Sequence, residues 1–300
     1  MKRLIVTADD FGAAREVNDA VEAAHRGGIL TAASLMVSAP EAADAVARAR
    51  LMPSLRVGLH LVLVEGRPAL PASAVPHLVD GSGVFRRDMA ALGAAMFFNP
   101  QAQRELASEI TAQFEAFRAS GLTLDHCNAH KHFHLHPVIG RLMVQIGQRF
   151  GLRAVRIPLE PRHVLRKIEP QTPRGPAWLT APFARLLRGR VRAAGLIAPN
   201  HVFGLQWSGH MTKARLSGLI RNLPAGLSEI YLHPATGSFA GAAPNYHYRE
   251  ELDALMAPEI VAASRDPSLK LGGFSDFPGL ETAIHSGASH GAMPSRSLMP

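Results

Sequence analysis

Short apolar runs alternate along the chain with segments of helical periodicity. The continuous, β-branched run at residues 3–9 (RLIVTAD) predicts a buried strand, and apolar positions spaced from Val17 to Ala24 predict the helix after it. Similar runs predict strands at 32–38, 55–63, 122–127, 153–157, 228–233 and 270–274. Helices are expected at 40–52, 101–121, 136–151 and 249–264. This alternation is typical of parallel β/α units and predicts an α/β fold.

Length and composition limit the class of protein. The chain has 300 residues, of which 47% are hydrophobic and 19% charged, which excludes global disorder. We expect one domain over residues 1–284, because an α/β barrel of this length is commonly a single domain. The tail at 285–300 has few large apolar residues and is expected to be disordered. The single cysteine, Cys127, excludes a disulfide scaffold and a cysteine-rich zinc finger.

No apolar run approaches the ~18 residues of a membrane-spanning helix. The N-terminal apolar run is also too short for the core of a signal peptide, which needs about 7–15 residues. We therefore expect a cytoplasmic protein.

One segment carries the entire excess of positive charge. The formal net charge is +8, and residues 153–192 hold ten Lys or Arg against two acidic residues, so the remainder is neutral. Within this insertion, at about 153–200, residues 181–197 could form a basic amphipathic helix with Phe183, Leu186 and Leu187 on one side. Such a helix suits an anionic membrane surface, and a solvated surface loop is the plainer interpretation. No nucleic-acid-binding motif is present, so no nucleic-acid partner is expected.

Polar side chains gather at the carboxyl ends of the predicted strands. Asp9 and Asp10 end the first strand, His60 lies near the end of another, and His233 ends a late one. A histidine-rich segment, HCNAHKHFHLH at 126–136, follows the predicted strand at 122–127. In a β/α barrel the loops at this rim converge, so catalytic residues collect there.

Each of these features also has a structural interpretation. Asp9 and Asp10 could cap a helix, and His60 alone would be an ordinary core histidine. The five histidines of the segment occupy even positions and would share one face of an extended chain: His126, His130, His132, His134 and His136. A cation cannot use five imidazoles, so one or two are expected to bind it, while His132 and His134 are candidates for contact with substrate. A histidine-rich surface loop without metal is the alternative.

A carboxylate with two imidazoles favours one divalent cation such as Zn²⁺, Co²⁺ or Ni²⁺ over Mg²⁺, which prefers oxygen ligands but stays an alternative. A second carboxylate that does not bind the metal can serve as a base. The sequence supplies both carboxylates and the histidines for a separate acid.

At these residues the sequence resembles the YdjC/ChbG family of carbohydrate deacetylases. The matching segments, in order, are TADDFG (7–12), GLHLVL (58–63), HCNAHKHFHLHP (126–137), EIYLHPA (229–235) and YREELDAL (248–255). The resemblance implies a distorted (β/α) barrel of the glycoside hydrolase and deacetylase type. It also implies metal-dependent hydrolysis of the N-acetyl group of a GlcNAc unit.

By motif position, the resemblance implies a role for each site residue. Asp10, His60 and His130 would hold the metal. Asp9 would be the base that activates water, and His233 the acid that protonates the leaving amine. One departure concerns Asn128, which stands where the family often has aspartate, so any role of a charge at that position is lost.

The Arg/Pro-rich insertion is most similar to the hopanoid-biosynthesis-associated branch of the family (HpnK). The resemblance then implies an N-acetylglucosaminyl hopanoid lipid as substrate, and we expect peripheral contact with the inner face of the membrane. The alternatives are a soluble chito-oligosaccharide deacetylase, a metal-dependent phosphoesterase, and a metal- or lipid-binding protein without activity. The sequence leaves a homodimer open.

Overall fold

The structure is a computed structural model, which describes residues 1–173, 175 and 177–278. The tail expected to be disordered, at 285–300, lies outside the described residues, and so does Arg174 of the basic insertion.

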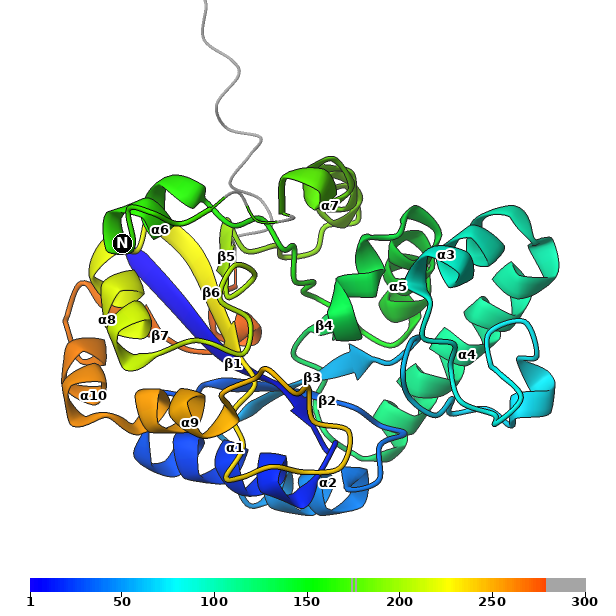
Figure 1. The fold of residues 1–300 in the computed structure, drawn as a ribbon, viewed down its shortest axis with the longest axis horizontal. Helices are drawn as coiled ribbons and strands as arrows, with labels where there is room; N and C mark the ends of the chain where they lie inside the picture. Colours follow the sequence, from blue (N-terminus) through cyan, green and yellow to red (C-terminus); the bar gives the residue numbers. More distant parts are fainter. Residues whose placement is uncertain (174, 176, 279–300) are drawn as a thin grey trace, which may run out of the picture.

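A sheet of parallel strands forms the centre of the molecule (Figure 1). The strands in the described part of the chain are β1 (Lys2–Phe11), β2 (Ala32–Leu35), β3 (Arg56–Leu61), β4 (Cys127–Ala129), β5 (His201–Phe203), β6 (Gly226–Leu232) and β7 (Leu269–Leu271). Their order is β4-β3-β2-β1-β6-β5, and β7 pairs with the first residues of β1 on the edge opposite β6. Every pairing is parallel, so all carboxyl ends lie at one rim. The α/β barrel predicted from the sequence is confirmed as a curled, incomplete barrel.

Isolated bridges continue the sheet beyond β4. The predicted strand at 153–157 is not a strand, because it pairs only through the parallel bridges Cys127–Val155 and Ala154–Ile197. A hydrogen bond from the Val202 amide to the Leu159 carbonyl, at 3.1 Å, leads from this segment to β5. The Pro- and Arg-rich sequence that follows prevents a longer ladder. The barrel is therefore distorted in the arc formed by the insertion.

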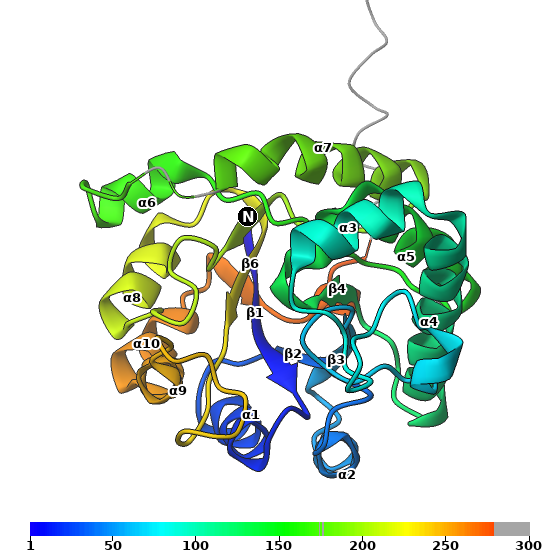
Figure 2. The same cartoon turned by 45° about the vertical axis from the view of Figure 1, so that its right-hand side comes forward.

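Helices surround the sheet (Figures 1 and 2). They are α1 (Arg15–Gly27), α2 (Ala42–Arg50), α3 (Met89–Phe98), α4 (Pro100–Ala119), α5 (Pro137–Arg149), α6 (Arg162–Ile168), α7 (Ala177–Ala193), α8 (Lys213–Asn222), α9 (Tyr248–Met256) and α10 (Pro258–Ser264). Short 3₁₀ segments are η1 (Ala72–Ala74), η2 (His130–Leu135) and η3 (Phe274–Asp276).

Local chemistry explains where these elements begin and end. Residues 4–6 and Ala8 of β1 are fully buried, because the strand has neighbours on both faces of the curled sheet. The Asn99 side chain accepts hydrogen bonds from the Gln101 and Ala102 amides and so begins α4, with Pro100 in its first turn. The predicted helix at 249–264 is divided into α9 and α10 at Pro258, which cannot donate a backbone hydrogen bond.

Helix α7 confirms the predicted basic helix but begins earlier and presents a different face. Ala184, Leu187 and Val191 are buried, whereas Phe183 and Leu186 are each 46% exposed. Arginines and large apolar side chains therefore lie together on the outer side of this helix.

No helix in the described ranges is both long enough and apolar enough to cross a bilayer.

Candidate active site

The backbone at the end of β1 turns its two carboxylates toward different partners. Asp10 adopts a left-handed conformation with φ of 62°, and the register of β1 against β2 shifts between Ala8 and Phe11. A non-glycine residue in this conformation is strained, and such strain is common at functional sites. As a result, Asp9 and Asp10 both line the same cleft yet contact separate groups.

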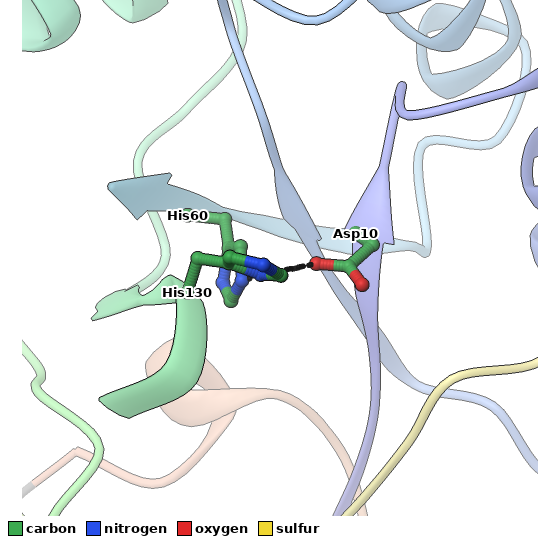
Figure 3. A group of neighbouring side chains, drawn as sticks. All are labelled: Asp10, His60 and His130. Atoms are coloured by element: carbon green, nitrogen blue, oxygen red, sulfur yellow. Dashed lines mark hydrogen bonds and ion pairs between the residues drawn. The ribbon is translucent and has the colours of Figure 1, made fainter. Parts of the chain in front are cut away.

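Asp10, His60 and His130 lie close enough to share one cation (Figure 3). The Asp10 Oδ1 atom lies 3.2 Å from His60 Nε2 and 3.1 Å from His130 Nδ1, and the candidate ligand atoms of the three residues all fall within 4.8 Å of one another. His60 comes from β3, and His130 begins η2 directly after β4. Two imidazole nitrogens facing one carboxylate oxygen form a donor set that suits a divalent transition metal. The residues present therefore fit the predicted metal.

Electrostatics favour an ionised carboxylate in this group. Burial alone raises the pKa of Asp10, but the positive charge of His130 and its hydrogen bond to Asp10, together with the nearby His60, hold the pKa well below its usual range. A carboxylate that stays ionised is available as a ligand at neutral pH.

Asp9 is held by a buried arginine. The Arg156 Nη1 atom donates to Asp9 Oδ2 at 2.5 Å and Nη2 donates to Oδ1 at 3.0 Å. The same guanidinium donates to Glu229, and all three side chains are buried. Burial raises the pKa of Asp9, but Arg156 and neighbouring histidines lower it well below its usual range. Asp9 is thus an oriented, ionised carboxylate outside the cation group.

The sequence did not identify Arg156 as a site residue. It was counted only within the basic insertion, although its position in the apolar run AVRI, with two buried acids elsewhere in the chain, marks it as a buried cation. Its guanidinium carbon also lies 4.5 Å from the centre of the Tyr231 ring. Tyr231, on β6, is a second residue that the sequence analysis missed.

The histidines of residues 126–136 do not share one face, so that prediction is wrong. Lys131 and His132 have φ of 52° and 54°, so η2 turns sharply where an extended chain was expected. His132 lines the cleft and its Nε2 lies 2.9 Å from the Tyr231 hydroxyl. His134, the other candidate for contact with substrate, is fully buried with its Nε2 3.0 Å from the Arg156 carbonyl oxygen and does not line the cleft.

His233 enters the cleft from the carboxyl end of β6. Its amide donates to Glu251 at 2.5 Å, which fixes the backbone, and its ring lies 5.0 Å from the ring of Tyr246. Within the described residues the buried His233 Nδ1 has no hydrogen-bond partner. The Tyr246 hydroxyl lies 2.7 Å from Ser208 Oγ. Tyr246 and Ser208 both line the cleft, and the sequence analysis singled out neither.

The cleft has a volume of about 1010 Å³ and is lined by both polar and apolar side chains. The predicted site residues Asp9, Asp10, His60, His130, His132 and His233 all line it. Its apolar lining includes Met36, Val62, Met89, Phe133 and Leu135. Helix α7 reaches the cleft at Thr180. A ligand that fills this space would combine a polar group with an apolar portion.

Comparison with known proteins places the chain among carbohydrate deacetylase relatives. A sequence model of the YdjC-like protein family matches residues 3–266. A carbohydrate deacetylase of Geobacillus stearothermophilus is 30% identical over 278 residues, which cover 91% of this chain and 97% of that protein. A carbohydrate deacetylase of Brevibacillus brevis is 40% identical over 156 residues, and this match covers 52% of this chain and 59% of that protein.

A solved structure has a similar fold. It belongs to a protein of Enterococcus faecalis V583 described as a candidate for cellobiose-phosphate cleavage, and it matches with a TM-score of 0.72 at 21% identity. The match covers 92% of this chain and 98% of that one. At this identity the likeness concerns the fold alone.

Proposed function

The chain belongs to the YdjC-like protein family, and from this premise we propose that it is a metal-dependent carbohydrate deacetylase. The proposed reaction removes the N-acetyl group from a GlcNAc unit by hydrolysis. The observation that carries the proposal is the group Asp10, His60 and His130, which lies beside a separate ionised carboxylate, Asp9, in one cleft. The carbohydrate deacetylases among its relatives support the same reaction class.

The three residues of the group would hold one divalent cation. When bound, such an ion lowers the pKa of water from ~15.7 to about 7 and polarises a carbonyl. Zn²⁺, Co²⁺ and Ni²⁺ match the two imidazole ligands, and Mg²⁺ is the alternative.

Asp9 and His233 would transfer the protons. Asp9 is ionised and held by Arg156, so it can accept a proton from the attacking water without first losing one. His233, directly after the strand β6 that neighbours β1, would donate a proton to the nitrogen as the carbon–nitrogen bond breaks, so that an amine departs. These roles need the two side chains to face one cleft, which they both line.

The shape and lining of the cleft favour an amphiphilic substrate. The apolar lining contributed by Met89, Phe133 and Leu135 has no evident use for a free oligosaccharide, whereas it suits the apolar portion of a glycolipid. Together with the resemblance of the insertion to the hopanoid-associated branch, this supports an N-acetylglucosaminyl hopanoid as substrate. The alternative, a chito-oligosaccharide, is favoured by the cluster of Tyr246 and Tyr248, whose rings lie 5.5 Å apart at the cleft.

The outer surface of α7 would place the enzyme on an anionic membrane. Leu179, Phe183 and Leu186 are exposed along this helix and alternate with Arg185 and Arg192, which are also exposed. Phe98 of α3 is 79% exposed, and its neighbour Phe97 contacts His136 at a ring distance of 6.0 Å. In Figure 2, α3 and α7 lie at the same end of the molecule. Exposed apolar side chains beside arginines suit a surface of anionic lipid.

Acetate release from two substrates tests the proposal. We expect release from an N-acetylglucosaminyl hopanoid in mixed micelles with a kcat/KM at least ten times that for N,N′-diacetylchitobiose. Equal or faster release from the disaccharide would support the chito-oligosaccharide alternative. Release from neither substrate, with a divalent cation present, would contradict the proposed deacetylase activity.

A further inference from the structure

A line of buried polar side chains connects His60 with the opposite end of the barrel. His60 Nδ1 lies 2.6 Å from the Asn128 amide oxygen, and the Asn128 amide nitrogen lies 2.9 Å from Ser34 Oγ. Ser34 Oγ lies 3.0 Å from His126 Nε2, and His126 Nδ1 lies 2.9 Å from Asp125 Oδ2. None of the five is more than 2% exposed. Polar groups this deeply buried cost free energy unless each has a hydrogen-bond partner. The donor–acceptor direction of each hydrogen bond therefore constrains the direction of the next.

Asp125 fixes the direction of the line at its far end. Its carboxylate accepts hydrogen bonds from the Phe274 amide at 3.2 Å and the Ser275 amide at 2.8 Å. Burial raises the pKa of Asp125, but His126 and Ser275 outweigh it and lower the pKa. An ionised carboxylate only accepts hydrogen bonds, so His126 Nδ1 must donate to it.

The backbone around His126 is built to hold this ring. A Cβ atom at Gly58 would lie 2.5 Å from His126 Cε1 and Nδ1, so β3 has no side chain where the ring passes. Phe274 stacks on the other face, with ring centres 4.6 Å apart. The ring is therefore fixed in place by packing as well as by its hydrogen bonds.

Starting at Asp125, the direction of each hydrogen bond determines the direction of the next one. With Nδ1 of the neutral His126 ring protonated, Nε2 is an acceptor, and the Ser34 hydroxyl donates to it. Ser34 Oγ then accepts from the Asn128 amide nitrogen, and the Asn128 amide oxygen accepts from His60 Nδ1–H. His60 Nε2, which lies 3.2 Å from Asp10, is left with a free lone pair. This is the tautomer that a cation at Asp10 requires.

Arg156 favours the opposite orientation of the Asn128 amide. Its Nη1 and Nη2 atoms lie 3.0 and 3.1 Å from the amide atom that faces Ser34, so both would donate to an oxygen placed there. With the amide turned over, its nitrogen would donate to His60 Nδ1, and Nε2 would carry the hydrogen. That second tautomer cannot bind a cation through Nε2. The amide thus has two orientations, and only one leaves His60 ready to bind metal.

We infer that Asp125, His126, Ser34 and Asn128 are positioning residues that set the tautomer of His60 and thereby the affinity of the site for a divalent cation. Asp125 and His126 direct Ser34, Ser34 orients the amide against the pull of Arg156, and the amide fixes the imidazole. This inference rests on the metal-holding role of His60 proposed above. None of the four contacts the substrate in this scheme.

The Ser34→Ala variant tests the inference by removing one hydroxyl from the middle of the line. Ser228→Ala is a matched control, because Ser228 is a fully buried serine on β6 whose Oγ has no hydrogen-bond partner among the described residues. Calorimetric titration with Co²⁺ should show binding weakened by about 10- to 100-fold in Ser34→Ala and unchanged in the control. Asn128→Asp should bind Co²⁺ more tightly than wild type, because a carboxylate accepts from His60 and Arg156 at once.

The tautomer of His60 gives a second readout that does not depend on metal. Nitrogen-15 NMR of the metal-free protein should show a lower fraction of the Nδ1–H form in Ser34→Ala than in wild type and Ser228→Ala. Unchanged tautomer and unchanged Co²⁺ affinity in a folded Ser34→Ala protein would overturn the inference while leaving the metal site intact. If wild type bound no cation, the proposed function would fail, and a tautomer shift in Ser34→Ala would still support the line as the device that positions His60.

Discussion

Adjacent carboxylates at the end of β1 have different neighbours, and this difference separates their proposed roles. Asp9 is buried against Arg156, whereas Asp10 faces His60 and His130. The left-handed backbone at Asp10 makes the divergence possible. Two side chains of the same type can therefore serve one as a base and the other as a metal ligand, because their neighbours differ.

The first prediction concerns Asp9. The Asp9→Asn substitution should lower the rate of acetate release by about 10²- to 10⁴-fold, because it removes the proposed base. The bound cation should be retained, because Asp10, His60 and His130 are unchanged. Rates and metal content measured on the same preparation check both statements. A variant that kept more than a tenth of the wild-type rate would contradict the assignment of Asp9.

Sequence reasoning could find some site residues and not others for a physical reason. Asp10 and His60 could be chosen because each lies at the end of an apolar strand, and parallel strands bring such ends together. The ion pairs of Arg156 could not be predicted in this way, because its partners Asp9 and Glu229 lie 147 and 73 residues away. The hydrophobic periodicity of a segment indicates which side chains face the core, but it does not indicate which distant residue each side chain contacts.

At the scale of elements, the sequence predicted long, strongly patterned segments best. The helix at 101–121 corresponds to α4, whose apolar face is buried, and residues 3–9 lie within β1. The short strand β5 and helices α3, α6 and α8 were not predicted. Helix α3 is apolar on all sides, so it lacks the periodicity that marks an amphipathic helix, and it follows a long loop rich in proline and glycine.

A second prediction concerns Glu160, whose partly buried carboxyl contacts the loop after β5. Glu160 accepts hydrogen bonds from the amides of Gly204, Leu205 and Gln206, and Leu205 and Gln206 line the cleft. Burial raises the pKa of Glu160 from 4.5 to about 7, although these hydrogen bonds oppose the rise. A raised carboxyl pKa gives stability that is complete below pH 4.5 and is lost as pH rises through 7.

The contribution of Glu160 to the free energy of unfolding should therefore fall by about 3 kcal/mol between pH 4.5 and pH 7.5. Denaturant unfolding of wild type and Glu160→Gln at a series of pH values isolates the contribution. The difference between the two proteins should change in this interval, because glutamine does not titrate. A difference that is constant with pH would contradict the raised pKa.

At the scale of the whole molecule, the basic insertion is concentrated on one side of the barrel. The net charge of +8 equals the excess within residues 153–192, and α7 displays part of it beside exposed apolar side chains. A peripheral contact with anionic lipid would bring the cleft near the bilayer, since α7 lines that cleft at Thr180.

Vesicle flotation tests this contact. The triple substitution of Arg185, Arg188 and Arg192 by glutamate should reduce binding to vesicles containing anionic lipid at least tenfold, with little change for neutral vesicles. The control is the triple substitution of Arg221, Arg249 and Arg265 by glutamate, which changes the net charge by the same amount. These arginines are exposed on α8, on α9 and in the loop after α10. Equal binding by wild type and the α7 variant would contradict a docking role for α7.

The cation is the centre of the whole account, and its removal is the most direct measurement. Acetate release from the N-acetylglucosaminyl substrate is followed in wild type after chelation, with the remaining metal quantified, and again as divalent cation is added back. The account predicts that release stops in the metal-free protein and returns in proportion to cation bound, up to one per chain. An undiminished rate in protein shown to be free of metal would contradict it.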